Sequence, residues 1–340
     1  MRKLTDLTED ELTGRFRNAF GPAAEGEVWT GDDAAVIGMG ERAVFTTDVM
    51  TEHVDFEFAW ATGADVGYKL IAVNVSDVAA MGAIPSKAVA TMTVVVDLEL
   101  AVIDGITEGM KAAAGRWGVS IVGGDIGRGS EVSLSLALLG DLPGPPLLRS
   151  GARSGDAICV TGSLGGAAAG LLALRSGLVD RDALDAELEQ PSGADALATL
   201  AARQLRPNAR LEESRRIAES GATAMIDISD GLALDLNRLL TASGVGCEIA
   251  ASAIPIDPEI AAALDRLQGP EPARLALTGG EDFELLFTIE PDLVEDVQVA
   301  VDEVGTSVTL IGRTTEDGRK IDGEPLEMWM EDAWDHLRSR

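Results

Sequence analysis

The chain has 340 residues, enough for two domains, and 46% of them are hydrophobic, so it can bury an extensive core. It carries 27 Lys and Arg against 57 Asp and Glu, a net charge of −30 that repels nucleic acids and anionic membranes. The first residues lack the apolar core of a signal peptide, and no uncharged apolar run has the roughly 18 residues of a membrane span. Only two cysteines occur, Cys159 and Cys247, far apart. We therefore expect a cytoplasmic protein with reduced thiols and with neither nucleic acid nor membrane as a partner.

The first part of the chain alternates strand-like and helical patterns. Apolar spacing predicts helices at 8–20, 64–81 and 100–116, and β-rich or alternating runs predict strands at 34–37, 43–47, 88–96, 119–122 and 132–139. After the first helix, the order ββαβαββ is typical of an α/β layer domain, which we assign to residues 1–145.

A segment with paired prolines and glycines, DLPGPPLLRSGARSGD from Asp141, interrupts this periodicity and is the predicted linker. After it, strands are predicted at 157–161, 224–228, 245–249, 283–289 and 308–311, and helices at 162–175, 193–219, 232–241 and 291–304. A Pro- and acid-containing segment near 254–272 is predicted to be a variable connection. We expect a second α/β domain over residues 146–340.

Acidic residues recur where these predicted elements meet, beside glycine, serine or threonine. Asp33 follows the turn GDD before a strand, and Thr46-Thr47-Asp48 ends the next strand. Hydroxyl and carboxylate oxygens are hard ligands that suit Mg²⁺. Each motif alone is also explained as a turn in which the acid accepts hydrogen bonds from backbone N–H groups.

A polar island interrupts the helix predicted at 64–81. Asn74, Ser76 and Asp77 are poor helix formers among residues of core character, and Asn74 and Asp77 share a face because they are three apart. Such an island needs polar partners, and we expect a metal cluster to supply them.

The motif Gly123-Gly124-Asp125 follows the strand predicted at 119–122. Glycines let backbone amides approach phosphate oxygens, and an acid at the carboxyl end of a strand lies where α/β proteins bind ligands. Arg149, in the predicted linker, could form a forked contact with a phosphate, or it could be an ordinary surface charge.

Two similar junctions occur in the C-terminal half. The motif DISDG from Asp227 lies between a predicted strand and a predicted helix, and helix capping explains only one of its two aspartates, Asp227 and Asp230. The motif TGGEDFE from Thr278 precedes a strand, and Glu281 is its better ligand candidate because it adjoins the glycines.

Together, these junctions predict several cations and a polyphosphate, because bare carboxylates repel phosphate groups. The chain has no G-x-x-x-x-G-K-[ST] loop and no protein-kinase motif set, and His53 and His336 are its only histidines, which makes a catalytic triad or a zinc site a poor interpretation. A non-catalytic acidic metal-binding protein is the alternative, but it would scatter its acids over helix surfaces.

In this order, the motifs resemble those of the thiamine-monophosphate kinases, in the superfamily of aminoimidazole ribonucleotide synthetase. The resemblance covers nearly the whole chain and rests on GDDAAV, TTD followed by DF, AVNVSDVAAMGAIP, GGDIGRG, LLRSGARSGD, VTGSLGGAAAGL, IDISDGLALDL and TGGEDFELLFT. It implies ATP-dependent phosphorylation of thiamine monophosphate to thiamine diphosphate, by direct in-line transfer through a Mg²⁺ cluster. A sister ATP-dependent synthetase of the superfamily is the alternative.

The resemblance also implies a homodimer in which the N-terminal sheet pairs with its copy, while the C-terminal domain closes over the active site. The implied metal ligands are Asp33, Thr46, Thr47, Asp48, Asp77, Asp125, Asp227 and Asp230. The implied ATP contacts are Gly124, Asp125, Arg149 and Ser229. Glu281 and Trp334, with Trp329 as a neighbouring candidate, are implied to hold thiamine. The family's His-Phe pair is replaced here by Asp55-Phe56, so either Asp55 or His53 takes the substrate-side role.

Overall fold

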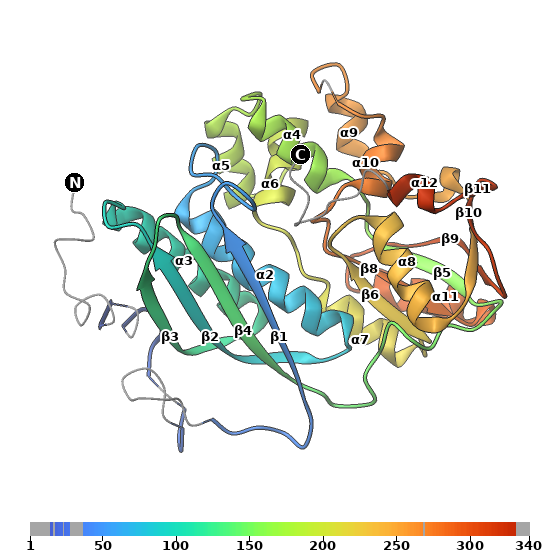
Figure 1. Ribbon diagram of the computed structural model, residues 1–340, viewed down its shortest axis with the longest axis horizontal. Coiled ribbons are helices and arrows are strands. Elements are labelled where there is room, and N and C mark those ends of the chain that lie inside the picture. The colour runs from blue at the N-terminus through green and yellow to red at the C-terminus, as the bar shows by residue number, and fades with distance from the viewer. Residues whose placement is uncertain (1–13, 16–17, 23, 28–36, 268, 331–340) are drawn as a thin grey trace. The chain divides into compact units, whose positions relative to one another are not determined.

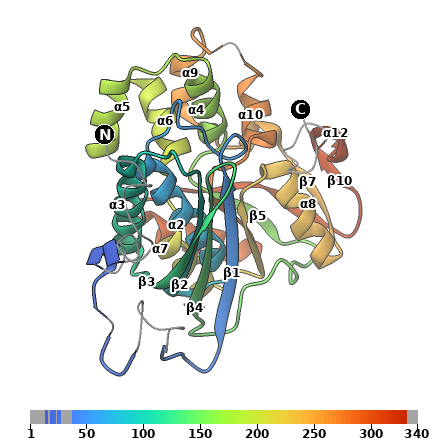
Figure 2. The same cartoon turned by 60° about the vertical axis from the view of Figure 1, so that its left-hand side comes forward.

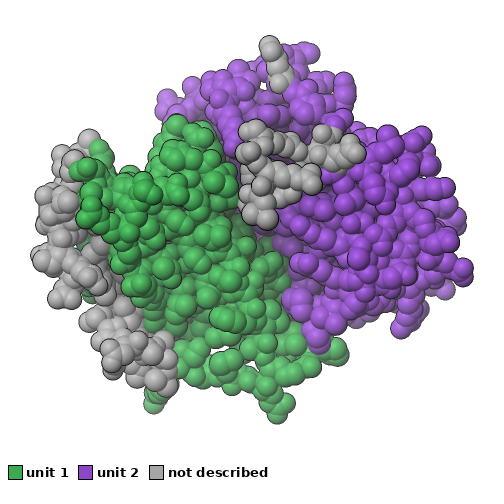
Figure 3. Space-filling model, in the orientation of Figure 1, with its two compact units in different colours: residues 1–78, 83–145 green, residues 79–82, 146–340 purple. Residues whose placement is uncertain are grey.

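The computed structural model describes residues 14–15, 18–22, 24–27, 37–267 and 269–330. The chain forms two compact units (Figure 3), and each is described by itself. Unit 1 comprises Met1–Val78 and Ala83–Pro145, and unit 2 comprises Ala79–Gly82 and Pro146–Arg340. Asp33 and Trp334, most of the strand predicted at 34–37 and most of the helix predicted at 8–20 lie outside the described residues.

Unit 1 is built on a four-stranded sheet of order β1-β4-β2-β3, in which β2 and β3 are parallel and the other neighbours are antiparallel (Figure 1). Its elements are β1 (Ala43–Thr51), α2 (Gly63–Ala80), β2 (Ile84–Val94), α3 (Leu100–Trp117), β3 (Ser120–Arg128) and β4 (Ser133–Asp141). Helices α2 and α3 lie on one face of this sheet (Figure 2). The elements predicted between 43 and 139 are therefore confirmed in type and order.

Buried and more exposed side chains alternate along the strands, which distinguishes the two faces of this sheet. Leu134, Leu136 and Leu138 of β4 are almost completely buried on the face that the helices cover. On the other face of the neighbouring strand β1, Phe45 is 69% exposed and Val49 is 60% exposed. The sheet thus has one face packed against helices and one face with exposed apolar side chains.

Unit 2 is built on a seven-stranded sheet of order β11-β10-β7-β9-β5-β8-β6, antiparallel except where β7 pairs with β10. Its strands are β5 (Ala157–Thr161), β6 (Ala224–Ile228), β7 (Gly246–Ile249), β8 (Glu284–Ile289), β9 (Val308–Thr315), β10 (Arg319–Ile321) and β11 (Glu324–Pro325). Its helices are α4 (Gly166–Arg175), α5 (Arg181–Glu189), α6 (Ala196–Leu205), α7 (Leu211–Glu219), α8 (Leu232–Ser243), α9 (Pro258–Ala263), α10 (Pro272–Thr278), α11 (Val294–Asp302) and α12 (Glu327–Met330).

The strands β5, β6 and β8 are buried along their whole length, which explains their nearly continuous apolar sequences. One core cluster joins these strands to α8 and α10, and a second joins them to α7 and α11. A third cluster packs α4, α6 and α9 together. Both units are α/β, as the sequence predicts.

The structure differs from the sequence prediction at 254–272, and it also contains α5, which the sequence does not predict. The segment 254–272, predicted as a variable connection, contains α9 and leads into α10. Pro258 and Pro272 occupy the first turns of these helices, where a missing N–H costs nothing. The helices predicted within 193–219 are α6 and α7, which are separated by a segment that contains Pro207. Among the described helices, none is both long and apolar enough to cross a membrane.

Candidate functional site

In unit 1, the polar island of α2 lies against the edge strand β1. Thr46 Oγ1 donates to Asp77 Oδ2 at 2.5 Å, and the backbone N–H of Asp48 donates to Asn74 Oδ1 at 3.2 Å. The structure therefore brings Thr46, Asp48 and Asp77 to one place, on the helix-covered face of the sheet. The motif TTD is not at a strand end, as predicted, but in the middle of β1.

Protein groups satisfy much of this island. The Asn74 side chain is fully buried, and its Nδ2 donates to the carbonyl of Leu70 at 2.9 Å while its Oδ1 accepts from Asp48. Asn74 thus joins β1 to α2. Because β1 is at the edge of the sheet, some of its N–H groups have no strand partner, and Asn74 accepts from one of them. The expectation that a metal must supply the partners of Asn74 is wrong, because the backbone supplies them.

Thr47 and Asp125 lie on the opposite, helix-free face of the same sheet. Thr47 precedes Asp48 in β1, and neighbouring side chains of a strand point to opposite faces. Asp125 pairs with Thr91 of β2, which pairs with Ser135 of β4 and so continues this face. Thr47 Oγ1 lies 3.4 Å from Ser135 Oγ. Within unit 1, the structure does not bring Asp125 to Asp77.

The glycines before Asp125 are part of strand β3 rather than of a turn after it, which corrects the prediction for GGD. A Cβ on Gly124 would lie 2.1 Å from the carbonyl oxygen of Ala90 in β2. The register of β2 and β3 shifts beside this point, between Ala88 and Val89. Gly124 is therefore needed for close strand pairing, whatever else it contacts.

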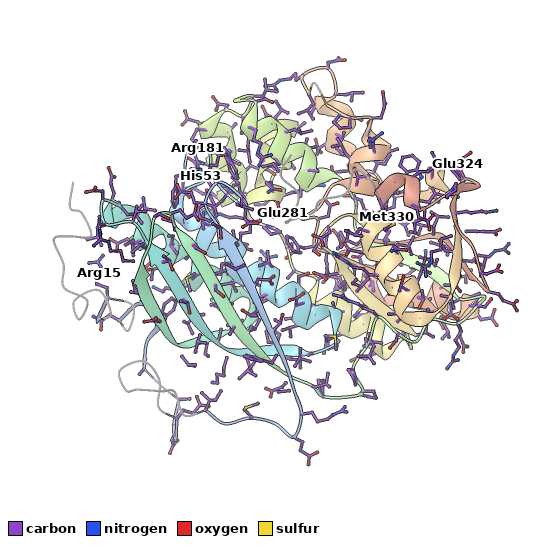
Figure 4. All side chains as sticks on the ribbon, in the orientation of Figure 1. Arg15, His53, Arg181, Glu281, Glu324 and Met330 are labelled. Carbon is purple, nitrogen blue, oxygen red and sulfur yellow. The ribbon has the colours of Figure 1, made fainter. Side chains whose placement is uncertain are left out.

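Asp55 and Phe56, which replace the His-Phe pair of the family that the sequence resembles, lie in the turn that follows β1. Asp55 Oδ2 accepts from the backbone N–H of Thr51 at 2.7 Å, so the carboxylate stabilises the turn. His53 is exposed and has a left-handed φ of 70° (Figure 4). The structure places both residues on one turn.

In unit 2, the two acidic junctions are held against each other by backbone hydrogen bonds. The N–H of Glu281 donates to the carbonyl of Ser229 at 2.8 Å, and that of Phe283 donates to the carbonyl of Ile228 at 2.9 Å. Glu281 and Phe283 both have positive φ, 70° and 50°, which costs free energy and is retained where surrounding structure fixes it. Asp227, Ser229, Asp230 and Glu281 are thus brought together, with Glu281 labelled in Figure 4.

Two residues that the sequence analysis missed hold the first of these turns. Asp235 is completely buried in the first turn of α8, and its Oδ2 accepts from the N–H groups of Ser229 and Asp230 at 3.0 and 2.9 Å. Arg238 donates to Asp235 at 2.6 Å and to Asp230 at 2.5 Å. Burial raises the pKa of Asp235 to about 6 against the opposing effect of these bonds. The sequence signal that could have identified Asp235 and Arg238 is their spacing after Asp230, five and eight residues along the chain.

The second turn is anchored to the helical layer of unit 2. Asp282 accepts from the N–H groups of Gly165 and Ala167 at 2.7 and 3.1 Å, at the start of α4. Burial raises the pKa of Asp282 to about 7, although its two backbone donors lower it. The side chain of Gln204, near the end of α6, donates to the Glu281 carboxylate.

A buried ion-pair network lies behind the same turn. Arg210 donates to both oxygens of Glu284, at 2.7 and 2.5 Å, and to Glu213 at 3.1 Å. Thr161 and Thr306 complete it, donating to Glu284 and to Glu213 respectively. Because the buried acids are paired and hydrogen-bonded, Glu284 serves the structure of the turn rather than a ligand.

Two further predicted site residues of unit 2 lie beside helix α8 or its core. The carbonyl of Arg149 accepts from Ser243, the last residue of α8, whereas Ser229 precedes the first turn of that helix. A 12-residue helix is about 18 Å long, so the carbonyl of Arg149 and the backbone of Ser229 lie near opposite ends of α8. Trp329 packs against the core cluster of α8, and its Nε1 is buried without a hydrogen-bond partner among the described residues.

Among the described residues, no group of three or more His, Cys, Asp or Glu side chains is close enough together to hold a metal ion. The donor set is nonetheless of the type that binds Mg²⁺, with hydroxyl and carboxylate oxygens in unit 1 and two aspartates on one turn in unit 2. A groove of about 430 Å³ is lined by Glu248, Leu310, Arg313 and Asp322 among others, and none of the candidate residues lines it.

Comparisons with family models and with known proteins agree on the family to which the chain is similar. The model of the AIR synthase related protein N-terminal domain matches residues 31–142, and that of the C-terminal domain matches 153–322. The chain is 35% identical to the thiamine-monophosphate kinase of Escherichia coli K12, covering 92% of each chain, and 33% identical to that of Aquifex aeolicus, covering 90% of this chain and 92% of the relative.

Solved structures agree with these relatives. A thiamine-monophosphate kinase from Stenotrophomonas maltophilia K279a matches with a TM-score of 0.80 and 31% identity, over 94% of this chain and 98% of the other. The structure of AaThiL complexed with AMPPCP and TMP matches with a TM-score of 0.74 and 30% identity, over 99% of both chains.

Proposed function

This chain belongs to the thiamine-monophosphate kinases, a family of AIR synthase related proteins, and we propose that it transfers the terminal phosphoryl group of ATP to thiamine monophosphate, forming thiamine diphosphate. The observation that carries the proposal is the pair of turns in unit 2. Backbone hydrogen bonds join the two turns that carry Asp227, Asp230 and Glu281, and Glu281 and Phe283 have left-handed φ, a strained conformation that is concentrated at functional sites.

We propose that the transfer is direct and in line, with a phosphate oxygen of thiamine monophosphate as the nucleophile. This oxygen is ionised at neutral pH, so the reaction needs positioning and charge neutralisation rather than a strong base. Glu281 would face the thiazolium ring, because a carboxylate complements its positive charge.

The residues that would hold Mg²⁺ form separate groups in the fold. They are Thr46, Asp48 and Asp77 on the helix-covered face of the unit 1 sheet, Thr47 and Asp125 on its other face, Asp227 and Asp230 in unit 2, and Asp33 outside the described residues. When bound, Mg²⁺ would neutralise the phosphate charges that these carboxylates alone repel. Thr46 supports this assignment, because its hydroxyl already orients the Asp77 carboxylate. Gly124, Asp125, Arg149 and Ser229 are the proposed ATP contacts, and Asp55, Glu281 and Trp334 the proposed thiamine contacts.

We also propose that two copies of the chain associate through the helix-free face of the unit 1 sheet. Phe45, Val49 and Val89 on this face are 69%, 60% and 41% exposed, and Leu139 lies between Phe45 and β2 on the same face. Exposed apolar groups that adjoin in this way favour a protein interface. Sedimentation of the wild type should give a dimer and that of Phe45→Glu a monomer, whereas a monomeric wild type would refute the proposal.

The activity is tested by incubating the protein with ATP, Mg²⁺ and thiamine monophosphate and by measuring thiamine diphosphate chromatographically. Free thiamine is the control acceptor, and it should give no product because it lacks the attacking phosphate. ATP hydrolysis without thiamine diphosphate would instead favour a sister ATP-dependent synthetase, and neither product nor hydrolysis would favour a non-catalytic protein.

A further inference from the structure

Gln204 is a buried amide side chain with one hydrogen-bond partner among the described residues. The residue is near the end of α6 and is only 1% exposed. Its Nε2 donates to Oε2 of Glu281, while its Oε1 is buried and has no hydrogen-bond partner in the described part of the chain. An ionised carboxylate can only accept, so Glu281 determines which end of the amide faces it.

This arrangement is unfavourable for stability. A buried acceptor without a donor keeps its desolvation penalty, whereas an apolar side chain of similar shape would avoid it. Leu200 and Leu205 of the same helix show that apolar residues are well accommodated on both sides of Gln204. The benefit of Gln204 therefore lies in its contact with Glu281 rather than in packing.

The backbone of Glu281 is already fixed, because it has a left-handed φ of 70° and donates to the carbonyl of Ser229. Its side chain still has three rotatable bonds, and their freedom must be lost when a ligand is bound. The hydrogen bond from Gln204 restricts these bonds in advance. A carboxylate held in this way binds a ligand with a smaller entropic penalty.

We propose that Gln204 is a positioning residue, which holds the Glu281 carboxylate in the orientation that receives the cationic end of the acceptor substrate. This inference rests on the proposed function, in which Glu281 faces the thiazolium ring. Gln204 acts through Glu281 and determines affinity for the acceptor rather than for ATP.

The test uses Gln204→Leu and Gln204→Met in the full chain, with KM for thiamine monophosphate and for ATP measured separately. We expect KM for thiamine monophosphate to rise about tenfold, the typical effect of losing a hydrogen bond to a charged group. KM for ATP should stay unchanged, and the thermal midpoint should stay the same or rise. Gln298→Leu is the matched control, because Gln298 is a half-buried amide of α11 that donates to the carbonyl of Val308 at 3.0 Å.

A double-mutant cycle with Glu281→Gln separates positioning from a structural role. If Gln204 acts through Glu281, Gln204→Leu should have no further effect on KM in the Glu281→Gln background. An active wild type whose KM for thiamine monophosphate is unchanged by both Gln204 variants would overturn this inference and leave the proposed function intact. A wild type that forms no thiamine diphosphate would overturn the proposed function, and this inference with it.

Discussion

Gly280 is the position at which a small change should separate folding from activity most clearly. It lies in the turn before β8, and a Cβ added there would be 2.6 Å from the carbonyl oxygen of Ser229. The neighbour is a backbone atom, so it cannot rotate away. The φ of Gly280 is outside the left-handed region, so alanine is compatible with the backbone and only the contact changes.

The size of the effect follows from this distance. An ordinary contact begins near 3.4 Å, so the Ser229 carbonyl must move by roughly 0.8 Å. The same oxygen accepts from the N–H of Glu281 at 2.8 Å, so the movement also disturbs the bond that joins the two turns. A displacement of about 1 Å can reduce activity about 100-fold, and overpacking costs about 1–3 kcal/mol of stability.

We therefore expect Gly280→Ala to remain folded and to lose kcat/KM by about 100-fold, measured by thiamine diphosphate formation. Gly115→Ala is the control, because Gly115 lies in α3 with no atom within 4 Å of an added Cβ. That variant should keep full activity and gain up to about 1 kcal/mol from its better helix propensity. Wild-type kcat/KM in Gly280→Ala would refute the claim that contact between the two turns positions the site.

Other substitutions test the proposed metal ligands, the buried network and the effect of pH. Asp77→Asn and Asp227→Asn should each lower kcat by orders of magnitude with circular dichroism unchanged, and near-normal turnover of either purified variant would contradict the ligand assignment. Arg210→Met should destabilise the protein by about 3–5 kcal/mol in urea unfolding, because it leaves buried carboxylates unpaired, whereas Arg215→Met at an exposed pair should cost less than about 1 kcal/mol. Burial raises the pKa of Asp282 to about 7, so the stability that its protonated form contributes is present below about pH 4 and is lost as the pH rises through 7. Urea unfolding should show that Asp282→Asn loses less stability than the wild type between about pH 5 and pH 8, and parallel curves for the two would contradict this cause.

The sequence predicted the elements whose pattern is local. Strands β5, β6 and β8 are continuous apolar runs, and α2 and α3 have clear helical spacing, so type and order followed from periodicity. The prediction was wrong where a residue has two possible roles. Pro258 and Pro272 open helices instead of interrupting them, and Gly124 lies within β3, where it permits close strand pairing, instead of after the strand.

For the candidate site, the sequence identified acids but not their partners. The faces of the unit 1 sheet depend on the pairing of β1, β4, β2 and β3, which no local pattern contains, so the separation of Asp125 from Asp77 was not predictable. The residues that hold the turns, Asp235 and Gln204, come from α8 and α6 and contact the turns only in the folded chain. Supporting residues of this kind have no motif of their own, because their role is defined by geometry.

The charges of unit 2 predict that ATP binding requires a divalent cation. Arg238 is paired with Asp230 and Asp235, and Arg210 with Glu284 and Glu213, so these arginines already compensate buried or half-buried acids. Two like charges 4 Å apart repel by about 4 kcal/mol at an effective dielectric constant near 20, so a polyphosphate beside these aspartates needs added positive charge. We therefore expect calorimetric titration to detect ATP binding with Mg²⁺ and to lose it in excess chelator. Equal affinity in both conditions would mean that protein cations alone bind the phosphates, and the proposed role of the aspartates would then be wrong.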